Sequence, residues 1–308
     1  MKRFLSTTAK LALTALVLFF VFRQFQEHWP GIKAYQWQLD PVWAVASLIL
    51  GIFALYLHSN LWRPIIRCLG HDISGPTAFR ILYLANLGRY IPGKVWQLFG
   101  ILYLTKKEGI SIDKAGASFV LMQMFSLPAS ALVFLVAAQF ESRILTDQVA
   151  LLSQESGWAL GLAMLLISGY IVFFPRKAIS KINWILGKMK RPAIELVIEK
   201  WTALKIFLGF CLAWAVYGLA FWLLTLSVSA SMKVGPVAAI GIFILAHQIG
   251  YLAIFAPGGI GPRELIMQLL LVPFLGPIAP AMVVVARVWS LLLDSLAAAL
   301  ALALRKQS

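Results

Sequence analysis

Long apolar stretches follow one another along this chain, and short polar loops separate them. A membrane-spanning helix needs about 20 mostly apolar residues in a row. Stretches of that kind predict helices at 5–22, 41–62, 115–138, 157–174, 204–229, 236–256 and 278–303. The pattern therefore predicts an all-α fold, a polytopic transmembrane helical bundle.

Two further apolar stretches, 77–105 and 263–276, are broken or short. Proline removes a backbone donor and glycine loosens a helix, so neither break suits a continuous span. Irregular backbone survives at membrane depth only where protein buries it or where it lines a wet cavity. We therefore expect about eight spans with broken or re-entrant helices near both breaks, an ordinary turn between spans being the alternative. The residues expected to break the helices are Pro92, Gly93, Pro257, Gly258, Gly259 and Gly261.

The composition agrees with a membrane protein. Hydrophobic residues make up 61% of the chain and charged residues 13%, against roughly 25% charged residues in a typical soluble domain. Because no stretch is long and polar enough for a separate soluble domain, we expect a single transmembrane domain over residues 1–308. The two breaks lie about half a chain apart, which favours an internal pseudo-repeat with halves of roughly 1–150 and 151–308.

The formal net charge of +15 comes from lysines and arginines concentrated in alternate loops. Cytoplasmic loops of membrane proteins collect such cations, so this distribution predicts a protein of the cytoplasmic (inner) membrane with both termini in the cytoplasm. If both termini lie in the cytoplasm, the chain must cross the membrane an even number of times. Residues 263–276 supply the eighth crossing if they span the membrane. We expect no nucleic-acid partner. The apolar run after Lys2 and Arg3 lacks a cleavage pattern and is expected to remain as the first span.

Motifs for catalysis or metal binding are missing from the sequence. Cys68 and Cys211 stand alone in apolar surroundings, without metal-ligand spacing. The segment from Gly88 to Lys94 reads GRYIPGK, but Val95 follows where a phosphate-binding loop would place Ser or Thr. We therefore expect no catalytic residues, no metal and no cofactor, and we do not expect an enzyme.

Some ionisable residues fall inside apolar stretches, where each is costly unless it is paired or hydrated. Arg287 and Asp294 are seven residues apart in the last stretch and hence on one helix face. They could pair through intervening groups, or with Glu264 and Arg263. A polar lining along a headgroup path and a structural ion pair between helices both explain them. His247 and Tyr251, four residues apart, are expected to face the same cavity, although a packing hydrogen bond is the alternative for His247.

Two motifs carry a resemblance to a known family. An N-x-x-R-Y-x-P-G-K stretch is paired with a late F-x-P-G-G-x-G-x-R-E stretch. The pair resembles the lysylphosphatidylglycerol synthase transmembrane-region family, also called flippase-like domain proteins. The resemblance implies a membrane domain of about eight helices that handles lipids, here in a stand-alone form without the aminoacyl-transfer domain. The matching residues are Asn86, Arg89, Tyr90, Pro92, Gly93, Lys94, Phe255, Pro257, Gly258, Gly259, Gly261, Arg263 and Glu264.

The leading hypothesis is a flippase-like protein that translocates or binds an anionic, aminoacylated or lipid-linked phospholipid headgroup. The rivals are a non-transporting scaffold for a lipid-modifying or glycosyl-transferring enzyme, and a membrane-embedded enzyme that uses Glu264 or Asp294 as acid or base. The expected partners are membrane lipids, with a homo-oligomer or a partner membrane enzyme as further possibilities. The residues expected to line the headgroup cavity are Asn86, Arg89, Tyr90, Lys94, His247, Tyr251, Arg263, Glu264, Arg287 and Asp294.

Overall fold

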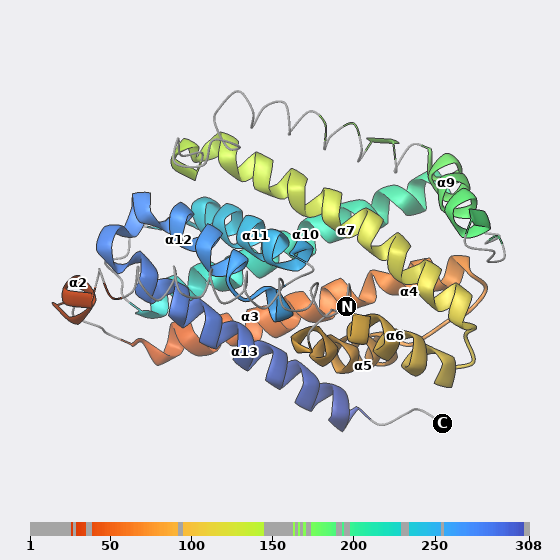
Figure 1. The fold of residues 1–308 in the computed structure, drawn as a ribbon, viewed down its shortest axis with the longest axis horizontal. Helices are drawn as coiled ribbons and strands as arrows, with labels where there is room; N and C mark the ends of the chain where they lie inside the picture. Colours follow the sequence, from red (N-terminus) through yellow and green to blue (C-terminus); the bar gives the residue numbers. More distant parts are fainter. Residues whose placement is uncertain are drawn as a thin grey trace, which may run out of the picture.

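The computed structural model describes residues 29–34, 39–91, 95–144, 174–188, 198–228, 234–253 and 256–304, and the single residues 26, 163, 166, 169, 170 and 193. Every regular element in these ranges is a helix (Figure 1), which confirms the all-α prediction. The predicted span 5–22 lies outside the described residues, and so does most of 157–174. Pro92, Gly93, Lys94 and Phe255 also lie outside them.

Four segments are long and apolar enough to cross a bilayer: Pro41–Cys68, Ile112–Phe140, Lys200–Val228 and Pro257–Ala303. The first comprises α3 (Pro41–Asn60) and α4 (Trp62–Cys68), and the next two are the single helices α7 (Ile112–Phe140) and α10 (Lys200–Val228). The fourth ends in α13 (Ala279–Ala303). The short helices α2 (Trp29–Ala34) and α9 (Pro175–Lys188) lie at the periphery (Figure 1).

Helices α3 and α10 pack against each other as an antiparallel pair. The Asp40 backbone N–H donates to the carbonyl of Ser227 at 2.7 Å, and the Ser47 hydroxyl donates to the carbonyl of Ala220 at 2.8 Å. Gly218 brings α10 against the next helix, because a Cβ there would lie 2.6 Å from Ile240 Cα. Such small residues let helices approach closely in membranes, where packing rather than hydrophobicity drives their association.

Helices α5 (Gly75–Asn86) and α6 (Val95–Lys107) form a first hairpin, with the short 3-10 turn η1 (Leu87–Tyr90) after α5. At about 1.5 Å per residue, the 13 residues of α6 reach about 20 Å, less than the roughly 30 Å hydrocarbon core. The two open ends of this hairpin lie close together. Lys114 Nζ, just after α6, donates to the carbonyl of Leu69, just before α5, at 3.0 Å. Arg80 of α5 lies 3.8 Å from Glu108, the residue after α6. This is the geometry expected of the re-entrant segment predicted at 77–105.

Helices α11 (Pro236–Leu252) and α12 (Pro262–Leu275) form a second hairpin around the 3-10 turn η4 (Pro257–Gly259). The turn η5 (Gly276–Ile278) leads from α12 to α13. The 14 residues of α12 reach only about 21 Å at about 1.5 Å per residue. The crossing that parity suggested for 263–276 is therefore too short to be a full span, and the segment has the length of a re-entrant half-helix.

The two hairpins start from opposite ends of the bundle, as their contacts with α7 show. The base of the first hairpin lies at the start of α7, where Lys114 reaches back to Leu69. The open end of the second lies beyond the other end of α7, where the Arg143 guanidinium sits 4.6 Å from the centre of the Phe274 ring. Their tips meet in the middle, because a Cβ on Gly258 would lie 2.7 Å from the Tyr90 ring.

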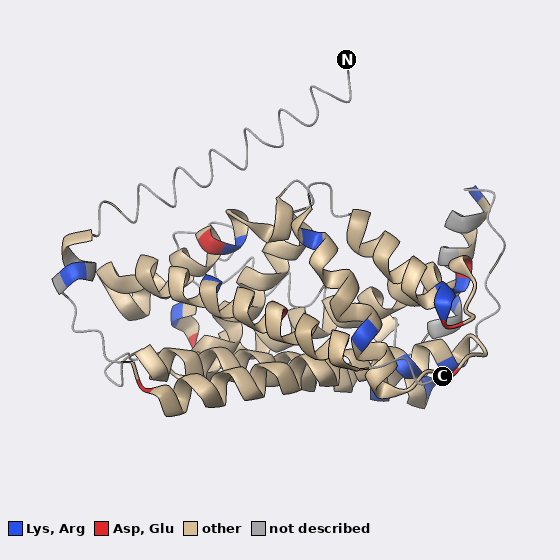
Figure 2. Cartoon of the chain, turned by 90° about the horizontal axis from the view of Figure 1, so that it is seen from below, with Lys and Arg blue, Asp and Glu red and all other residues tan. Residues whose placement is uncertain are grey.

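Lysines and arginines of the described residues gather mainly at one end of the bundle (Figure 2). This is the end at which α4 and α6 finish and at which α7 and α10 begin. The positive-inside rule predicts that this end faces the cytoplasm. Its cations include Arg67, Lys106, Lys107, Lys114, Lys200 and Lys205.

Candidate functional site

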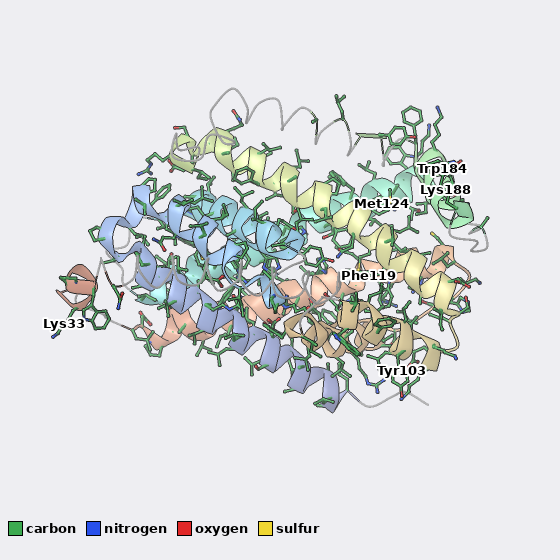
Figure 3. All side chains as sticks on the ribbon, in the orientation of Figure 1. Lys33, Tyr103, Phe119, Met124, Trp184 and Lys188 are labelled. Atoms are coloured by element: carbon green, nitrogen blue, oxygen red, sulfur yellow. The ribbon has the colours of Figure 1, made fainter. Side chains whose placement is uncertain are left out.

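A cavity of about 100 Å³ lies between α3, α5, α6, α7, α10, α11 and α13, at the tip of the first hairpin. Its apolar wall includes Leu55, Met122 and Phe119, the last of which is labelled on α7 in Figure 3. Most of the lining nevertheless carries a polar group, which is unusual for the middle of an apolar bundle. These residues are His58, Tyr83, Asn86, Arg89, Gln97, Gln123, Ser126, Trp214, Tyr217, His247, Gln248, Tyr251 and Asp294.

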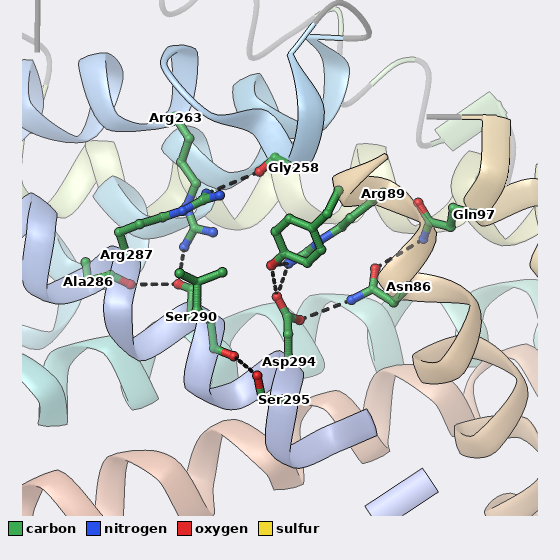
Figure 4. Close-up of polar contacts among 12 residues, drawn as sticks. Asn86, Arg89, Gln97, Gly258, Arg263, Ala286, Arg287, Ser290, Asp294 and Ser295 are labelled. Carbon is green, nitrogen blue, oxygen red and sulfur yellow. Dashed lines mark hydrogen bonds and ion pairs between the residues drawn. The ribbon is translucent and has the colours of Figure 1, made fainter. Parts of the chain in front are cut away.

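Asp294 of α13 is the centre of the polar contacts at the first hairpin tip (Figure 4). Its carboxylate forms an ion pair with Arg89 and accepts a hydrogen bond from the Tyr90 hydroxyl. Asn86 Nδ2 donates to its other oxygen at 3.1 Å, and Gln97 Nε2 donates to Asn86 Oδ1 at 3.3 Å. Because Asp294 is 6% exposed, these donors replace the water that a buried carboxylate loses.

Glu264 of α12 holds the tip of the second hairpin. Its Oε2 accepts the backbone N–H of Gly261 at 2.6 Å, which caps the start of α12. Its Oε1 lies 3.2 Å from Arg287 NH1 of α13. The same Arg287 atom donates to the carbonyl of Gly258 at 3.2 Å. A carboxylate at a helix amino end is favourable in its own right, so Glu264 stabilises the break and binds α13 at once.

Arg263 lies behind this tip, 5% exposed, and its NH2 donates to the Ser290 hydroxyl at 2.8 Å. Its guanidinium is 5.3 Å from the centre of the Phe243 ring, a cation–π contact. The side chain passes close to α11, because a Cβ on Gly250 would lie 2.7 Å from Arg263 Cβ. Arg263 therefore joins α11, α12 and α13.

One face of α13 binds both hairpin tips. Arg287, Ser290 and Asp294 recur at intervals of three and four residues, so they share that face. The pairing of Arg287 with Glu264 is confirmed. Asp294, however, pairs with Arg89 of the first hairpin, which the sequence analysis did not foresee. The five buried or half-buried ionisable residues here are Arg89, Arg263, Arg287, Glu264 and Asp294, three cations against two anions, which leaves a formal charge of +1.

Glycines explain how the tips come so close. Gly258 has φ +58, a left-handed conformation that other residues adopt only at a cost. Gly259, with φ +72, lies against the α11 backbone, because a Cβ there would be 2.8 Å from the Gly250 carbonyl oxygen. The expected break at Pro257-Gly258-Gly259 is thus a tight turn packed on α11 and on Tyr90.

Most of the predicted site residues lie together, but they divide into two groups. Asn86, Arg89, His247, Tyr251 and Asp294 line the cavity. His247 and Tyr251 share it as expected. Tyr90 binds Asp294 beside the cavity, whereas Arg263, Glu264 and Arg287 contact the second tip and α13 without lining it. The prediction for Lys94 falls outside the described residues.

Other cavity residues were missed by the sequence analysis. His58 Nε2 lies 3.1 Å from Ser126 Oγ, which also accepts the indole N–H of Trp214 at 3.1 Å. Gln123 donates to the hydroxyl of Tyr251, and Gln248 is 9% exposed. The signal that could have found them is an amide, imidazole or hydroxyl inside a long apolar stretch. Serine and tyrosine are common there, so His58, Gln123 and Gln248 were the informative ones.

Long apolar helices, two half-length hairpins meeting tip to tip, and a buried charged site between them define a polytopic membrane protein with re-entrant helices. Such broken helices build central substrate sites in transporters. Residues 7–298 match the family described as Lysylphosphatidylglycerol synthase TM region, and the chain belongs to that family. The family indicates an integral membrane protein related to lipid modification or lipid flipping. The search of curated proteins found no match.

Proposed function

We propose that this protein is a flippase-like translocator that carries an anionic, aminoacylated or lipid-linked phospholipid headgroup across the membrane. The observation that carries the proposal is the polar cavity in the centre of the bundle, with Arg89 and Asp294 in its wall. Charged groups inside a membrane are costly and mark substrate paths more often than chance. Family membership supports a lipid as the substrate.

The position of the cavity suits translocation. The two hairpins enter from opposite ends of the bundle, and Arg89 of η1 lines the cavity between them. A headgroup that leaves water loses its hydrogen bonds, and this loss forms the barrier to unaided flipping. Polar side chains at the midpoint would replace those bonds, while the acyl chains stay in the surrounding lipid.

Small movements of the tips would open the cavity to either side. Side-chain bonds hold the tips to α13. Those of the first tip run from Asn86, Arg89 and Tyr90 to Asp294. Those of the second join Glu264 and Gly258 to Arg287, and Arg263 to Ser290. Alternating access in transporters of this kind involves one broken element moving against a fixed site. We propose passive or ion-coupled movement in the cytoplasmic membrane, with both chain ends in the cytoplasm.

Reconstitution into sealed liposomes tests the proposal. Lipids with an unmodified headgroup and a fluorescent label on a short acyl chain are placed in both leaflets, and membrane-impermeant dithionite then quenches the outer leaflet. A translocator lets dithionite quench nearly all of the fluorescence with time, whereas protein-free liposomes retain about half. Liposomes that contain an unrelated helical membrane protein at the same density control for leakage. If no phospholipid of a broad anionic, aminoacylated and lipid-linked panel is flipped, the proposal is wrong.

The scaffold function remains a second candidate because of one observation. Three charged residues connect α12 to α13 without lining the cavity, as a dry ion-pair network would: Arg263, Glu264 and Arg287. A scaffold would bind a lipid-modifying or glycosyl-transferring enzyme stably and flip no lipid. Co-purification of such an enzyme from gently solubilised membranes, together with a negative flipping assay, would favour it.

A further inference from the structure

Helix α9 concentrates positive charge on a short element at the surface of the bundle. Its 14 residues include the cations Arg176, Lys177, Lys181 and Lys188 and contain no Asp or Glu. The helix lies at the edge of the bundle, at the end where α7 and α10 begin (Figure 1), and Figure 2 shows it crosswise to the long axis of the bundle. A cationic helix with this direction suits the membrane surface rather than the membrane interior.

The two sides of α9 differ in polarity. Lys177, Trp184 and Lys188 follow one another at intervals of seven and four residues, so they share one face of the helix. All three are exposed, Trp184 by 62%. Ile179, two positions after Lys177 and hence on the opposite side, is 6% exposed and belongs to the hydrophobic core. The helix therefore packs on the protein through Ile179 and turns its cationic face outward.

Exposed aromatic rings accompany the lysines of this segment. Lys188 Nζ lies 3.8 Å from the centre of the Trp184 ring, and both residues are labelled on α9 in Figure 3. Lys177 Nζ lies 5.1 Å from the centre of the ring of Phe174, the residue before α9. Tryptophan gathers at headgroup level in membranes. A lysine places its stem along apolar surface and its ammonium in polar surroundings, so each pair combines an apolar body with a charged tip.

The same combination recurs on α6. Lys107 Nζ lies 4.5 Å from the centre of the ring of Tyr103, which is exposed. Tyr103 is labelled in Figure 3 at the same end of the bundle as α9. Lysines beside exposed rings, repeated at one end on two separate elements, suit the boundary between acyl chains and phosphates. This recurrence favours a lipid surface over an acidic protein as the partner of α9.

We propose that α9 is a membrane-surface helix whose outward face, formed by Lys177, Trp184 and Lys188, docks on the anionic headgroups of the adjacent leaflet. Recognition is by charge, so no single headgroup is required. Each lysine near an anionic membrane strengthens binding roughly fivefold, and salt weakens the attraction by screening it. The proposal concerns the surface of the bundle and does not depend on translocation through the cavity.

A fluorescent label on α9 of the full-length chain measures the docking. Ser180→Cys, an exposed position on the same side as Lys177, is labelled in a protein that also carries Cys68→Ser and Cys211→Ala. The protein is placed in nanodiscs of phosphatidylcholine alone, of equal parts phosphatidylcholine and phosphatidylglycerol, or of equal parts phosphatidylcholine and phosphatidylserine. Acrylamide, a neutral quencher that the membrane charge does not repel, then reports how accessible the label is from water.

We expect acrylamide quenching to fall about twofold in both anionic membranes relative to phosphatidylcholine, and to recover at high salt. Equal quenching in the three membranes would overturn the proposal and would leave an acidic protein as the partner of this face. Shielding by phosphatidylglycerol but not by phosphatidylserine would also overturn it, because the helix would then recognise a headgroup rather than a charge.

Charge reversal connects the shielding to the lysines of α9. Lys177→Glu with Lys188→Glu should give the phosphatidylcholine level of quenching in all three membranes. The matched control, Lys33→Glu with Lys106→Glu, reverses two exposed lysines outside α9 and should keep the wild-type difference. If the charge-reversed protein does not fold, Lys177→Gln with Lys188→Gln should lose part of the shielding. Full shielding in a folded variant of either kind would show that the proposal is wrong.

Discussion

At the residue scale, Asp294 holds together groups that are far apart in the chain. Arg89 is 205 positions away and Asn86 is 208 positions away. Neither hydropathy nor spacing within one helix encodes such a pairing, so the sequence predicted that Asp294 needs a partner but not which one. The pairing of Arg287 with Glu264 was easier to foresee, because both lie in the last two apolar stretches and the number of candidates was small.

The Arg89–Asp294 pair allows a stability prediction. Asp294→Asn leaves Arg89 charged, buried and without its ion pair, which destabilises proteins by ~3–5 kcal/mol. The double variant Arg89→Met with Asp294→Leu removes both charges and should lose much less stability, because apolar replacement of a buried pair is often neutral. Unfolding of the purified protein in an SDS titration measures both free energies.

An exposed pair provides the control. Arg143 Nε and Glu141 Oε1 lie 2.7 Å apart at the end of α7, with the arginine side chain 57% exposed. Surface pairs contribute only about 0–1 kcal/mol, so Glu141→Gln should have a small effect. If Asp294→Asn is no more destabilising than Glu141→Gln, the central ion pair does not hold the hairpin tip.

Gly258 allows a test of the contact between the tips. Gly258→Ala places a Cβ on a residue in the left-handed conformation, which costs ~1–2 kcal/mol. The same Cβ also clashes with the Tyr90 ring. Gly70→Ala shares the left-handed strain, with φ +81, but meets nothing within 4 Å. We expect Gly258→Ala to destabilise by about 1–3 kcal/mol more than Gly70→Ala, the usual effect of overpacking, in the same SDS titration. Equal effects of the two substitutions would mean that the tips are not in contact.

At the element scale, the hairpins were predictable in outline because their signals are local. Pro257 and the glycines after it ended α11 and began α12 close to the expected place. The lengths of α6 and α12, 13 and 14 residues, are too short for either helix to cross the bilayer. What the sequence could not show is that the two hairpins face one another, since that depends on contacts of Tyr90 with Gly258 and of both tips with α13.

The opposite entry of the hairpins predicts a labelling pattern for single cysteines. The background carries Cys68→Ser and Cys211→Ala, and an impermeant thiol reagent is added to intact or to opened cells. Asp72→Cys and Lys106→Cys, at the base of the first hairpin, should react from one side of the membrane. Ser142→Cys and Pro277→Cys, at the base of the second, should react from the other. Reaction of all four from one side would contradict the arrangement.

At the scale of the whole molecule, composition and loop charge predicted the bundle and its direction. The described lysines and arginines gather mainly at one end (Figure 2). The central cavity could not be predicted, because its walls come from seven α-helices and the turn η1, and most of its residues are polar side chains scattered among apolar ones.

Reporter fusions at the end of the chain test the orientation. The α13 helix runs toward the cationic end, so a fluorescent protein that folds only in the cytoplasm should fluoresce when it follows Ser308. A phosphatase that is active only outside the cytoplasm should remain inactive at the same position. The reverse result would show that the positive-inside rule fails for this chain.

The most direct test of the central claim measures lipid flipping by a variant in which the ion pair of the cavity has been replaced by apolar side chains. Wild-type protein, the double variant Arg89→Met with Asp294→Leu, and the control Gln139→Leu, which changes an exposed glutamine on α7, are reconstituted at equal density, and SDS titration confirms that each is folded. We predict rapid dithionite-accessible flipping for the wild type and Gln139→Leu, and flipping at the protein-free rate for the double variant. Flipping by the folded double variant as fast as by the wild type would contradict the claim that this buried polar cavity carries the headgroup.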